Sequence, residues 1–143
     1  MHLTRFTDYG LRVLMYAALQ PQGEKARIAE VSQVFGISRN HVMKIVNRLA
    51  NEGWLATSRG KGGGFQLGQH TEKIGVGAVV RTLEESLEIV DCEGDSCPII
   101  TCCRLKSALN SAREAFLGEL DNYTLADLVS SPRRLKQVLQ LSG

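Results

Sequence analysis

Four cysteines lie within twelve positions of the sequence, at Cys92, Cys97, Cys102 and Cys103. In an intracellular protein, such a cluster is more typical of a metal or redox site than of a disulfide framework. Zinc is a poor fit, because zinc ligands usually come as two pairs, each spaced by about two to four residues. Iron centres favour soft thiolate ligands and tolerate irregular spacing, so the cluster indicates an iron–sulfur site. A zinc site, a thiol redox switch and purely structural thiols stay open as alternatives.

The two adjacent thiols are not expected to act alike. Neighbouring side chains point apart in a helix, so only Cys102 or Cys103 should face the metal. The loop of residues 91–103 then supplies three thiolates, and another group must complete the cluster.

A second set of residues is suited to reading DNA. Four apolar residues recur at the spacing of one helix face, namely Val42, Ile45, Val46 and Leu49. The polar and basic residues around the start of the same helix are Ser38, Arg39, Asn40, His41 and Lys44. Ser38 is a suitable N-cap, and donor-rich side chains near a helix N-terminus can reach base edges in the major groove. A merely solvated helix face is the simpler alternative.

A basic, glycine-rich segment connects two predicted strands, at residues 54–57 and 65–67. Arg59 and Lys61 are placed to meet phosphates, and Gly62 and Gly63, with the glycines beside them, would let the backbone approach DNA closely. The segment is therefore predicted to be a wing with a mainly positional role.

The remaining periodicity indicates the elements that position these residues. Helices are expected at residues 4–19, 26–35 and 74–87, a longer one at residues 104–120, and two short ones near the end of the chain. The expected fold is mainly α. It is a winged helix-turn-helix with a small two-stranded wing, followed by a long C-terminal dimerisation helix whose narrow apolar seam should meet another helix.

Composition narrows the class of protein. The 143 residues are 43% hydrophobic and 22% charged, which excludes disordered and collagen-like chains. No run approaches the ~18–20 apolar residues of a membrane span, and the N-terminus has no apolar signal core, so we expect a cytoplasmic protein. Residues 1–70 hold nine basic and four acidic residues, or +5, whereas residues 71–143 hold eight and eleven, or −3. This split predicts a DNA-binding region at 1–70 and a region for the cluster and dimerisation at 71–143.

Four segments resemble the winged-helix iron–sulfur repressors that include IscR and NsrR. They are residues 3–12 (LTRFTDYGLR), residues 38–45 (SRNHVMKI), residues 59–64 (RGKGGG) and residues 121–128 (DNYTLADL). The likeness covers almost the whole chain and is closest to the NsrR type, which senses nitric oxide. NsrR-type proteins space their thiols as Cys-x4-Cys-x5-Cys, whereas IscR-type proteins place one more residue between the first two. IscR-type proteins also have a histidine shortly after the third cysteine, where this chain has Lys106 and Ser107.

The resemblance implies a set of metal ligands. The NsrR-type spacing selects Cys92, Cys97 and Cys103, and Cys102 departs from the family pattern. An aspartate that matches Asp8 would complete the cluster from the partner subunit. The simpler interpretation of Asp8 is an acid near a helix N-terminus, stabilised there by about 0.3–1 kcal/mol. We favour the ligand, and a 4Fe–4S cluster over a 2Fe–2S cluster.

The function that follows is a homodimeric repressor bound to a palindromic operator in double-stranded DNA. Nitric oxide would attack the cluster, release the DNA and derepress nitric-oxide detoxification genes. The alternative is a cluster-free or zinc-containing regulator that senses thiol redox state. No phosphate-binding loop follows a strand, and His2, His41 and His70 have no partnered nucleophile, so an enzyme is not expected.

Overall fold

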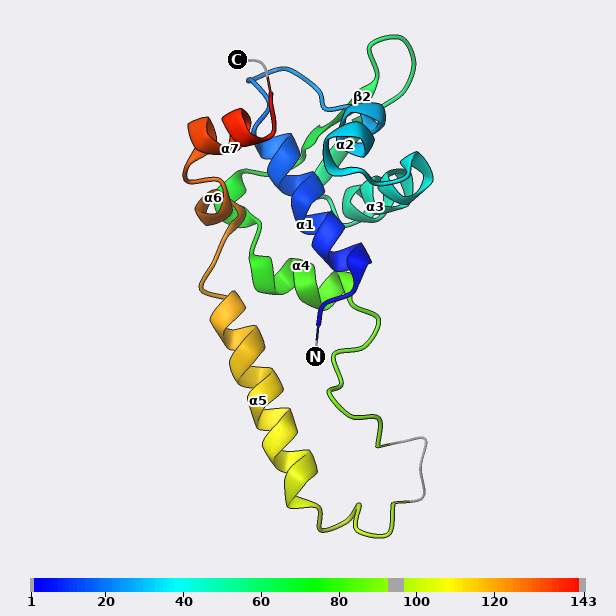
Figure 1. The fold of residues 1–143 in the computed structure, drawn as a ribbon, viewed down its shortest axis with the longest axis vertical. Helices are drawn as coiled ribbons and strands as arrows, with labels where there is room; N and C mark the ends of the chain where they lie inside the picture. Colours follow the sequence, from blue (N-terminus) through cyan, green and yellow to red (C-terminus); the bar gives the residue numbers. More distant parts are fainter. Residues whose placement is uncertain (1, 93–96, 142–143) are drawn as a thin grey trace.

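Seven α-helices and one two-stranded sheet form the part of the chain that the computed structural model describes, which is residues 2–92 and 97–141. The helices are α1 (Arg5–Ala18), α2 (Ile28–Phe35), α3 (Arg39–Asn51), α4 (Val76–Leu83), α5 (Arg104–Leu120), α6 (Leu125–Leu128) and α7 (Pro132–Val138). The strands are β1 (Leu55–Ser58) and β2 (Gly64–Leu67), and a short 3-10 turn covers Thr71–Lys73. Helix α5 projects away from a body formed by the other elements (Figure 1). None of the helices described is both long and apolar enough to cross a membrane.

Local signals set the helix ends. The Thr4 hydroxyl accepts a hydrogen bond from the Thr7 amide at the start of α1, and Ser38 does the same for His41 at the start of α3. Gly36 ends α2 with a φ of 64°, a left-handed conformation that favours glycine. The predicted helix-turn-helix is confirmed, as is the predicted hairpin between β1 and β2.

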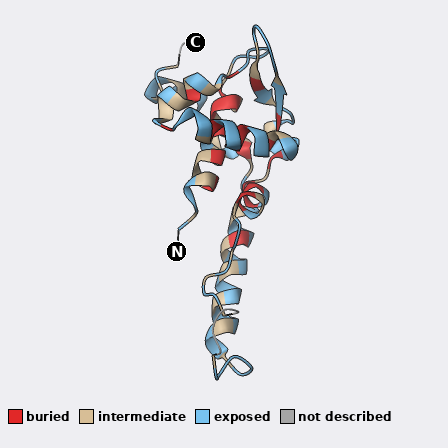
Figure 2. Ribbon diagram, turned by 90° about the vertical axis from the view of Figure 1, so that its right-hand side faces the viewer, coloured by how far each residue is buried: buried red, intermediate tan, exposed pale blue. Residues whose placement is uncertain are grey.

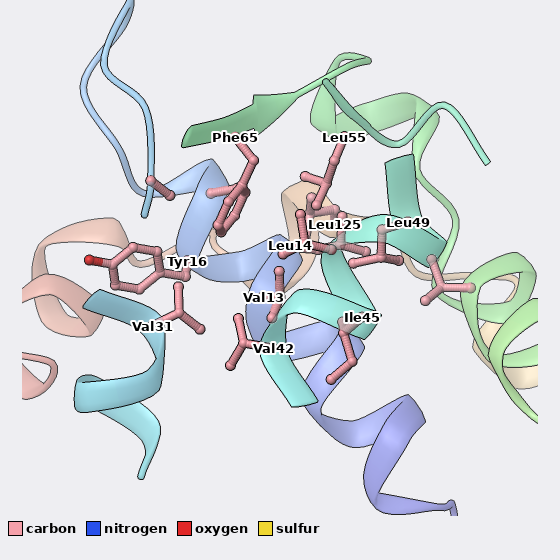
Figure 3. Close-up of a cluster of buried hydrophobic side chains, with 14 of the residues drawn as sticks. Val13, Leu14, Tyr16, Val31, Val42, Ile45, Leu49, Leu55, Phe65 and Leu125 are labelled. Atoms are coloured by element: carbon pink, nitrogen blue, oxygen red, sulfur yellow. The ribbon is translucent and has the colours of Figure 1, made fainter. Parts of the chain in front are cut away.

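The core gathers around α1, which packs against α3, α4, β2 and α6. Figure 3 shows Val13 and Leu14 of α1 among side chains from α3, the wing strands and α6. Val42, Ile45 and Leu49 of α3 are fully buried on this side. The apolar face predicted for α3 therefore holds α3 against α1, which leaves the opposite face of α3 to solvent.

The wing is tied to the body at its base. Strands β1 and β2 pair antiparallel, with Leu55 opposite Leu67 and Ser58 opposite Gly64. Phe65 is buried and exchanges two backbone hydrogen bonds with Ala26, at 2.8 and 2.9 Å, so the segment before α2 extends the hairpin. The loop of residues 59–63 projects beyond this anchored base (Figure 1).

Helix α4 is shorter than predicted. The expected helix at residues 74–87 is wrong at both ends, because α4 covers only Val76–Leu83. Glu84 leaves the helix with a ψ of 129°, and its Oε1 accepts hydrogen bonds from the Thr4 amide at 2.8 Å and the Thr4 hydroxyl at 3.0 Å. The apolar periodicity of the sequence continues beyond Leu83, but α4 ends where Glu84 bonds to Thr4, a residue 80 positions away.

The chain returns to the body after α5. The Val76 amide donates to Tyr123 O at 2.9 Å, the Leu125 amide donates to Ile74 O at 2.8 Å, and Leu125 joins the core that α1 organises. The two short helices predicted for the tail are confirmed as α6 and α7. Residues from beyond position 70 therefore complete the core of the winged helix, and the division at residues 70 and 71 stays a prediction.

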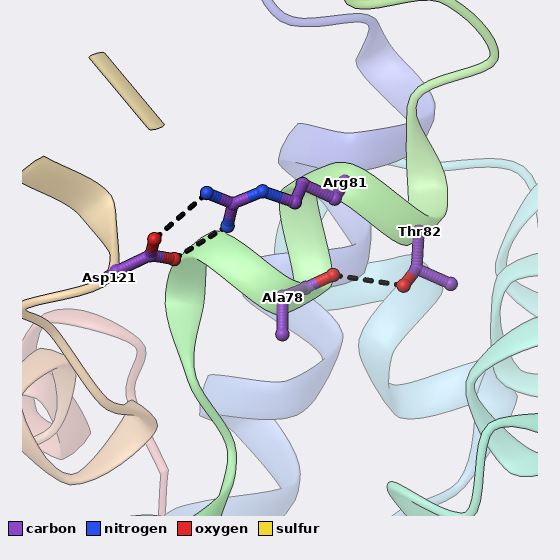
Figure 4. Close-up of polar contacts among 4 residues, drawn as sticks. All are labelled: Ala78, Arg81, Thr82 and Asp121. Carbon is purple, nitrogen blue, oxygen red and sulfur yellow. Dashed lines mark hydrogen bonds and ion pairs between the residues drawn. The ribbon is translucent and has the colours of Figure 1, made fainter. Parts of the chain in front are cut away.

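An ion pair joins α4 to the end of α5. Arg81 donates two hydrogen bonds to the Asp121 carboxylate, at 2.5 and 2.8 Å (Figure 4). These bonds hold the pKa of the Asp121 carboxyl below its ordinary value. Gly77 makes room for the pair, because a Cβ at this position would overlap Asp121 Oδ1.

We expect Gly77→Ala to reveal this constraint. Alanine in a helix interior stabilises by about 0.5–1 kcal/mol relative to glycine, and Gly77, as the second residue of α4, should gain at most this amount. Here the added methyl displaces the Asp121 carboxylate, so the gain should be cancelled or reversed. In an Asp121→Ala background, Gly77→Ala should give the full gain, as measured by chemical denaturation of the four variants.

Gly118→Ala is the matched control, because a Cβ at Gly118 meets open space. It should stabilise the protein equally with and without Asp121. An equal gain from Gly77→Ala in both backgrounds would show that the carboxylate does not need the glycine.

Candidate nucleic-acid interface and thiol loop

The outer face of α3 carries the polar residues predicted to read DNA. Ser38, Arg39, Asn40 and Lys44 are exposed. Asn40 and Lys44 lie on the side opposite to the buried apolar face, whereas Ser38 and Arg39 lie at the N-terminal end of the helix. Because Ser38 caps the helix, these side chains cluster around its N-terminal end, where they are free to meet a ligand. The structure brings them together as predicted, and their contact with DNA stays a prediction.

His41 differs from the other members of the predicted set. Its ring is half-buried between two aromatic side chains of α1, at centroid distances of 6.0 Å from Phe6 and 5.4 Å from Tyr9. The Tyr9 contact is edge-to-face, a favoured geometry for rings. His41 therefore links the N-terminal ends of α1 and α3, in addition to any contact with a base.

Two cations lie at the tip of the wing. Arg59 and Lys61 are exposed, and Gly60 and Gly62 beside them have φ values of 88° and 81°. The glycine at position 63 has an intramolecular role, because a Cβ there would overlap the carbonyl oxygens of Ser58 and Gly60. The tight turn by itself thus requires glycine at positions 62 and 63. The close approach of this backbone to DNA stays a prediction.

The four thiols lie on the segment that leads into α5. All four are free, with Cys92, Cys97 and Cys103 half-buried and Cys102 exposed. Residues 93–96, between the first two thiols, lie outside the described residues. The structure thus distinguishes the three thiols that the family spacing selects from the fourth by their burial.

The two adjacent thiols also differ in their hydrogen bonds. Cys103 is the N-cap of α5, and its Sγ accepts from the Lys106 amide at 3.4 Å. Cys102 Sγ lies 3.6 Å from the Ile99 carbonyl oxygen and donates to it. Cys103 Sγ therefore acts as a hydrogen-bond acceptor, whereas Cys102 Sγ acts as a donor.

Asp8 lies on α1, apart from the thiol loop. Its carboxylate accepts two hydrogen bonds from Arg12, at 3.0 and 2.8 Å, and it is partly exposed. Among the residues that the structure describes, no three His, Cys, Asp or Glu side chains of one chain lie close enough together to hold a metal ion. The donor set nevertheless suits iron chemically, because the loop offers three free thiols and no disulfide competes for them.

Two further residues of the interface are absent from the predicted set. Tyr9 packs on His41, and Met43 is an exposed apolar residue on the outer side of α3. The exposure of Met43 could have been predicted from helical spacing, because Met43 directly follows Val42 of the apolar face and precedes Lys44 on the polar side.

Solved structures share this arrangement. The B. subtilis global cysteine regulator CymR is 25% identical, with 91% of this chain and 97% of that chain covered at a TM-score of 0.73. CymR from Staphylococcus aureus is 26% identical, with coverage of 87% and 95% and a TM-score of 0.70. IscR from T. potens is 21% identical, with 91% of this chain and 87% of that chain covered at a TM-score of 0.71. At this identity the likeness supports the fold alone.

A family model extends the comparison from fold to function. The model for Rrf2, described as an iron-dependent transcriptional regulator, matches residues 3–131. Rrf2 proteins are DNA-binding transcription factors, not enzymes. The match spans most of the sequence, and the chain therefore belongs to the Rrf2 family of transcriptional regulators.

Proposed function

We propose that the protein is a cytoplasmic, homodimeric repressor that holds an iron–sulfur cluster and releases its operator in response to nitric oxide. One observation carries the proposal. Three free, half-buried thiols lie in the segment that joins the winged helix to α5. A metal bound there would connect the DNA-reading half to the helix that pairs two subunits.

The DNA-binding role rests on the exposed end of α3 and on the wing. Asn40 and Lys44 point away from the core, and Arg59 and Lys61 extend the basic surface to the wing. In this proposal α3 enters the major groove and the wing holds phosphates. The charge of +5 over residues 1–70 favours a polyanionic partner.

The dimer rests on α5. Leu117 is its only buried residue, and Figure 2 shows the helix mostly in the colours of intermediate and exposed residues. The apolar seam predicted for this helix consists of Leu105, Leu109, Ala112, Phe116 and Leu120, and Leu105 at its start is 65% exposed. Pairing of two such seams would bury this surface and place two α3 helices on half-sites of a palindrome, about 34 Å apart.

The proposed ligands are Cys92, Cys97 and Cys103, with Asp8 of the partner subunit. A 4Fe–4S cluster held by them would supply iron that reacts with nitric oxide. Cys103 presents a sulfur that already accepts an N–H bond, so it can bind metal without uncapping α5. Asp8 already shares its carboxylate with Arg12, and its position on α1 would tie the ligand to a helix against which α3 packs.

A second candidate is a regulator that senses thiol oxidation with zinc or with no metal. The exposure of Cys102, which the proposed cluster does not use, favours this alternative. Iron and sulfide analysis of anaerobically prepared protein distinguishes the two.

The central experiment measures operator binding by fluorescence anisotropy. The anaerobic, iron-containing dimer should bind its selected duplex tightly, and stoichiometric nitric oxide should weaken binding by at least about tenfold, or ~1.4 kcal/mol. Binding that persists unchanged after nitric oxide would refute the signal. Equally tight binding by the iron-free protein would refute the role of the metal.

Replacing single thiols tests the ligand set. Cys92→Ser should abolish the visible absorbance of the cluster and its sulfide content, whereas Cys102→Ser should retain both. Circular dichroism would show that both variants keep their helices. Loss of the chromophore in Cys102→Ser, with retention in Cys103→Ser, would exchange the roles of the two neighbours.

Replacing wing cations tests the phosphate contacts. Arg59→Ala or Lys61→Ala should weaken binding to all duplexes alike and reduce the salt slope of log K by about 0.9 for each lost contact. Arg133→Ala, an exposed cation on α7, is the control and should leave the slope unchanged. An unaltered slope in both wing variants would contradict the assignment.

A further inference from the structure

Met43 is the one large apolar residue that is exposed among residues 2–70, with 43% of its surface accessible to solvent. The other exposed large apolar residues that the structure describes all lie at position 90 or beyond. A methionine left in water on a basic surface loses the benefit of burial that its neighbours on α3 obtain. A single exposed apolar residue is ordinary in itself, and what distinguishes Met43 is its place among the polar and basic residues of α3.

Helix geometry places Met43 on the proposed reading face. Buried Val42, Ile45, Val46 and Leu49 define the inner side of α3. At about 100° per residue, Met43 projects on the outer side, next to Arg39 and Asn40 and one position before Lys44. It lies in the second turn of the helix, within the N-terminal half that enters a major groove in helix-turn-helix proteins. His41, by contrast, is turned toward Phe6 and Tyr9.

We propose that Met43 is a specificity-determining residue that recognises thymine through its C5-methyl group, which rests on the proposed DNA-binding function. The cations around it favour DNA over an apolar protein surface. Among the four bases, thymine alone presents an apolar group in the major groove. A flexible, unbranched thioether chain can adapt its shape to that methyl. Arg39, Asn40 and Lys44 would read or hold polar groups on either side of this contact.

The size of the effect follows from the area of one methyl. Removing a methyl or methylene from water is worth about 0.8 kcal/mol, which corresponds to roughly a fourfold change in affinity. A dimer on a palindrome makes the contact twice, so loss in both half-sites should multiply the factor.

The experiment uses uracil, which differs from thymine only by this methyl. The anaerobic, iron-containing dimer first selects its preferred sequence from a pool of randomised DNA duplexes. Each dT of the selected half-site is then replaced by dU, and binding of the wild type, Met43→Ala and Val138→Ala is measured by anisotropy. Val138→Ala is the matched control, because Val138 is an exposed apolar residue on α7.

For the wild type and Val138→Ala, one dT→dU change in the half-site should weaken binding about fourfold. Met43→Ala loses the contact in both half-sites, so it should bind the thymine duplex about as weakly as the wild type binds a duplex with that dT→dU change in both half-sites, or about sixteenfold more weakly than the wild type binds thymine. It should not respond to the change. An unchanged melting temperature in Met43→Ala would exclude a folding defect, because the side chain is exposed and alanine suits a helix.

Four outcomes would overturn the inference. Selected DNA that tolerates every dT→dU change, or a Met43→Ala variant that keeps the wild-type response, would refute it and leave the proposed function intact. A changed oligomeric state in Met43→Ala, with unchanged DNA binding, would assign the residue to a protein contact. Failure of the wild type to select any sequence would refute the proposed function itself.

Discussion

The packing of one face of α1 against α3, α4, β2 and α6 is the constraint on which the rest of the structure depends. Val13 and Leu14 are fully buried within it. Gly10 lets α4 come close, because a Cβ at this position would overlap Leu83 Cδ1. Helix α3 rests on α1 as well as on α2 and β1, so the direction of its exposed face depends on the position of α1 within this packing. A signal that moves α1 relative to α2 and β1 would therefore alter the setting of the DNA-reading side chains.

The connection from α5 to this core depends more on shape than on charge. Arg81 and Asp121 have side chains 38% and 49% exposed, and water screens the attraction between such exposed charges, so the pair contributes little to stability. Gly77, in contrast, sets how closely the end of α5 can approach α4. Gly77 thus allows the end of α5 to lie close to α4, and the ion pair between Arg81 and Asp121 holds it there. Because the pKa of Asp121 is lowered, the carboxylate stays charged at neutral pH, and the pair is lost only as the pH falls through that lowered pKa.

Features governed by neighbouring residues could be predicted from the sequence. The cap Ser38, the hairpin of the wing and the bounds of α5 depend on contacts within a few positions, and the structure confirms them. The end of α4 could not be predicted, because Glu84 is held by Thr4, 80 positions away. The burial of His41 is also a tertiary effect, since its partners Phe6 and Tyr9 belong to another helix. The sequence shows which residues of the helix are polar, but only the packing of the other helices shows which of these side chains stay exposed to a ligand.

The candidate metal site illustrates the same difference at a finer scale. Helix geometry alone did not decide whether Cys102 or Cys103 binds the metal, because it predicts only that two adjacent side chains point apart. Their hydrogen bonds are not equivalent, since Cys103 Sγ accepts from Lys106 and Cys102 Sγ donates to Ile99 O. A sulfur that binds metal gives up its proton but keeps lone pairs, so Cys103 can retain its bond and Cys102 cannot. Metal binding at Cys103 would therefore preserve the start of α5, the helix on which the proposed dimer depends.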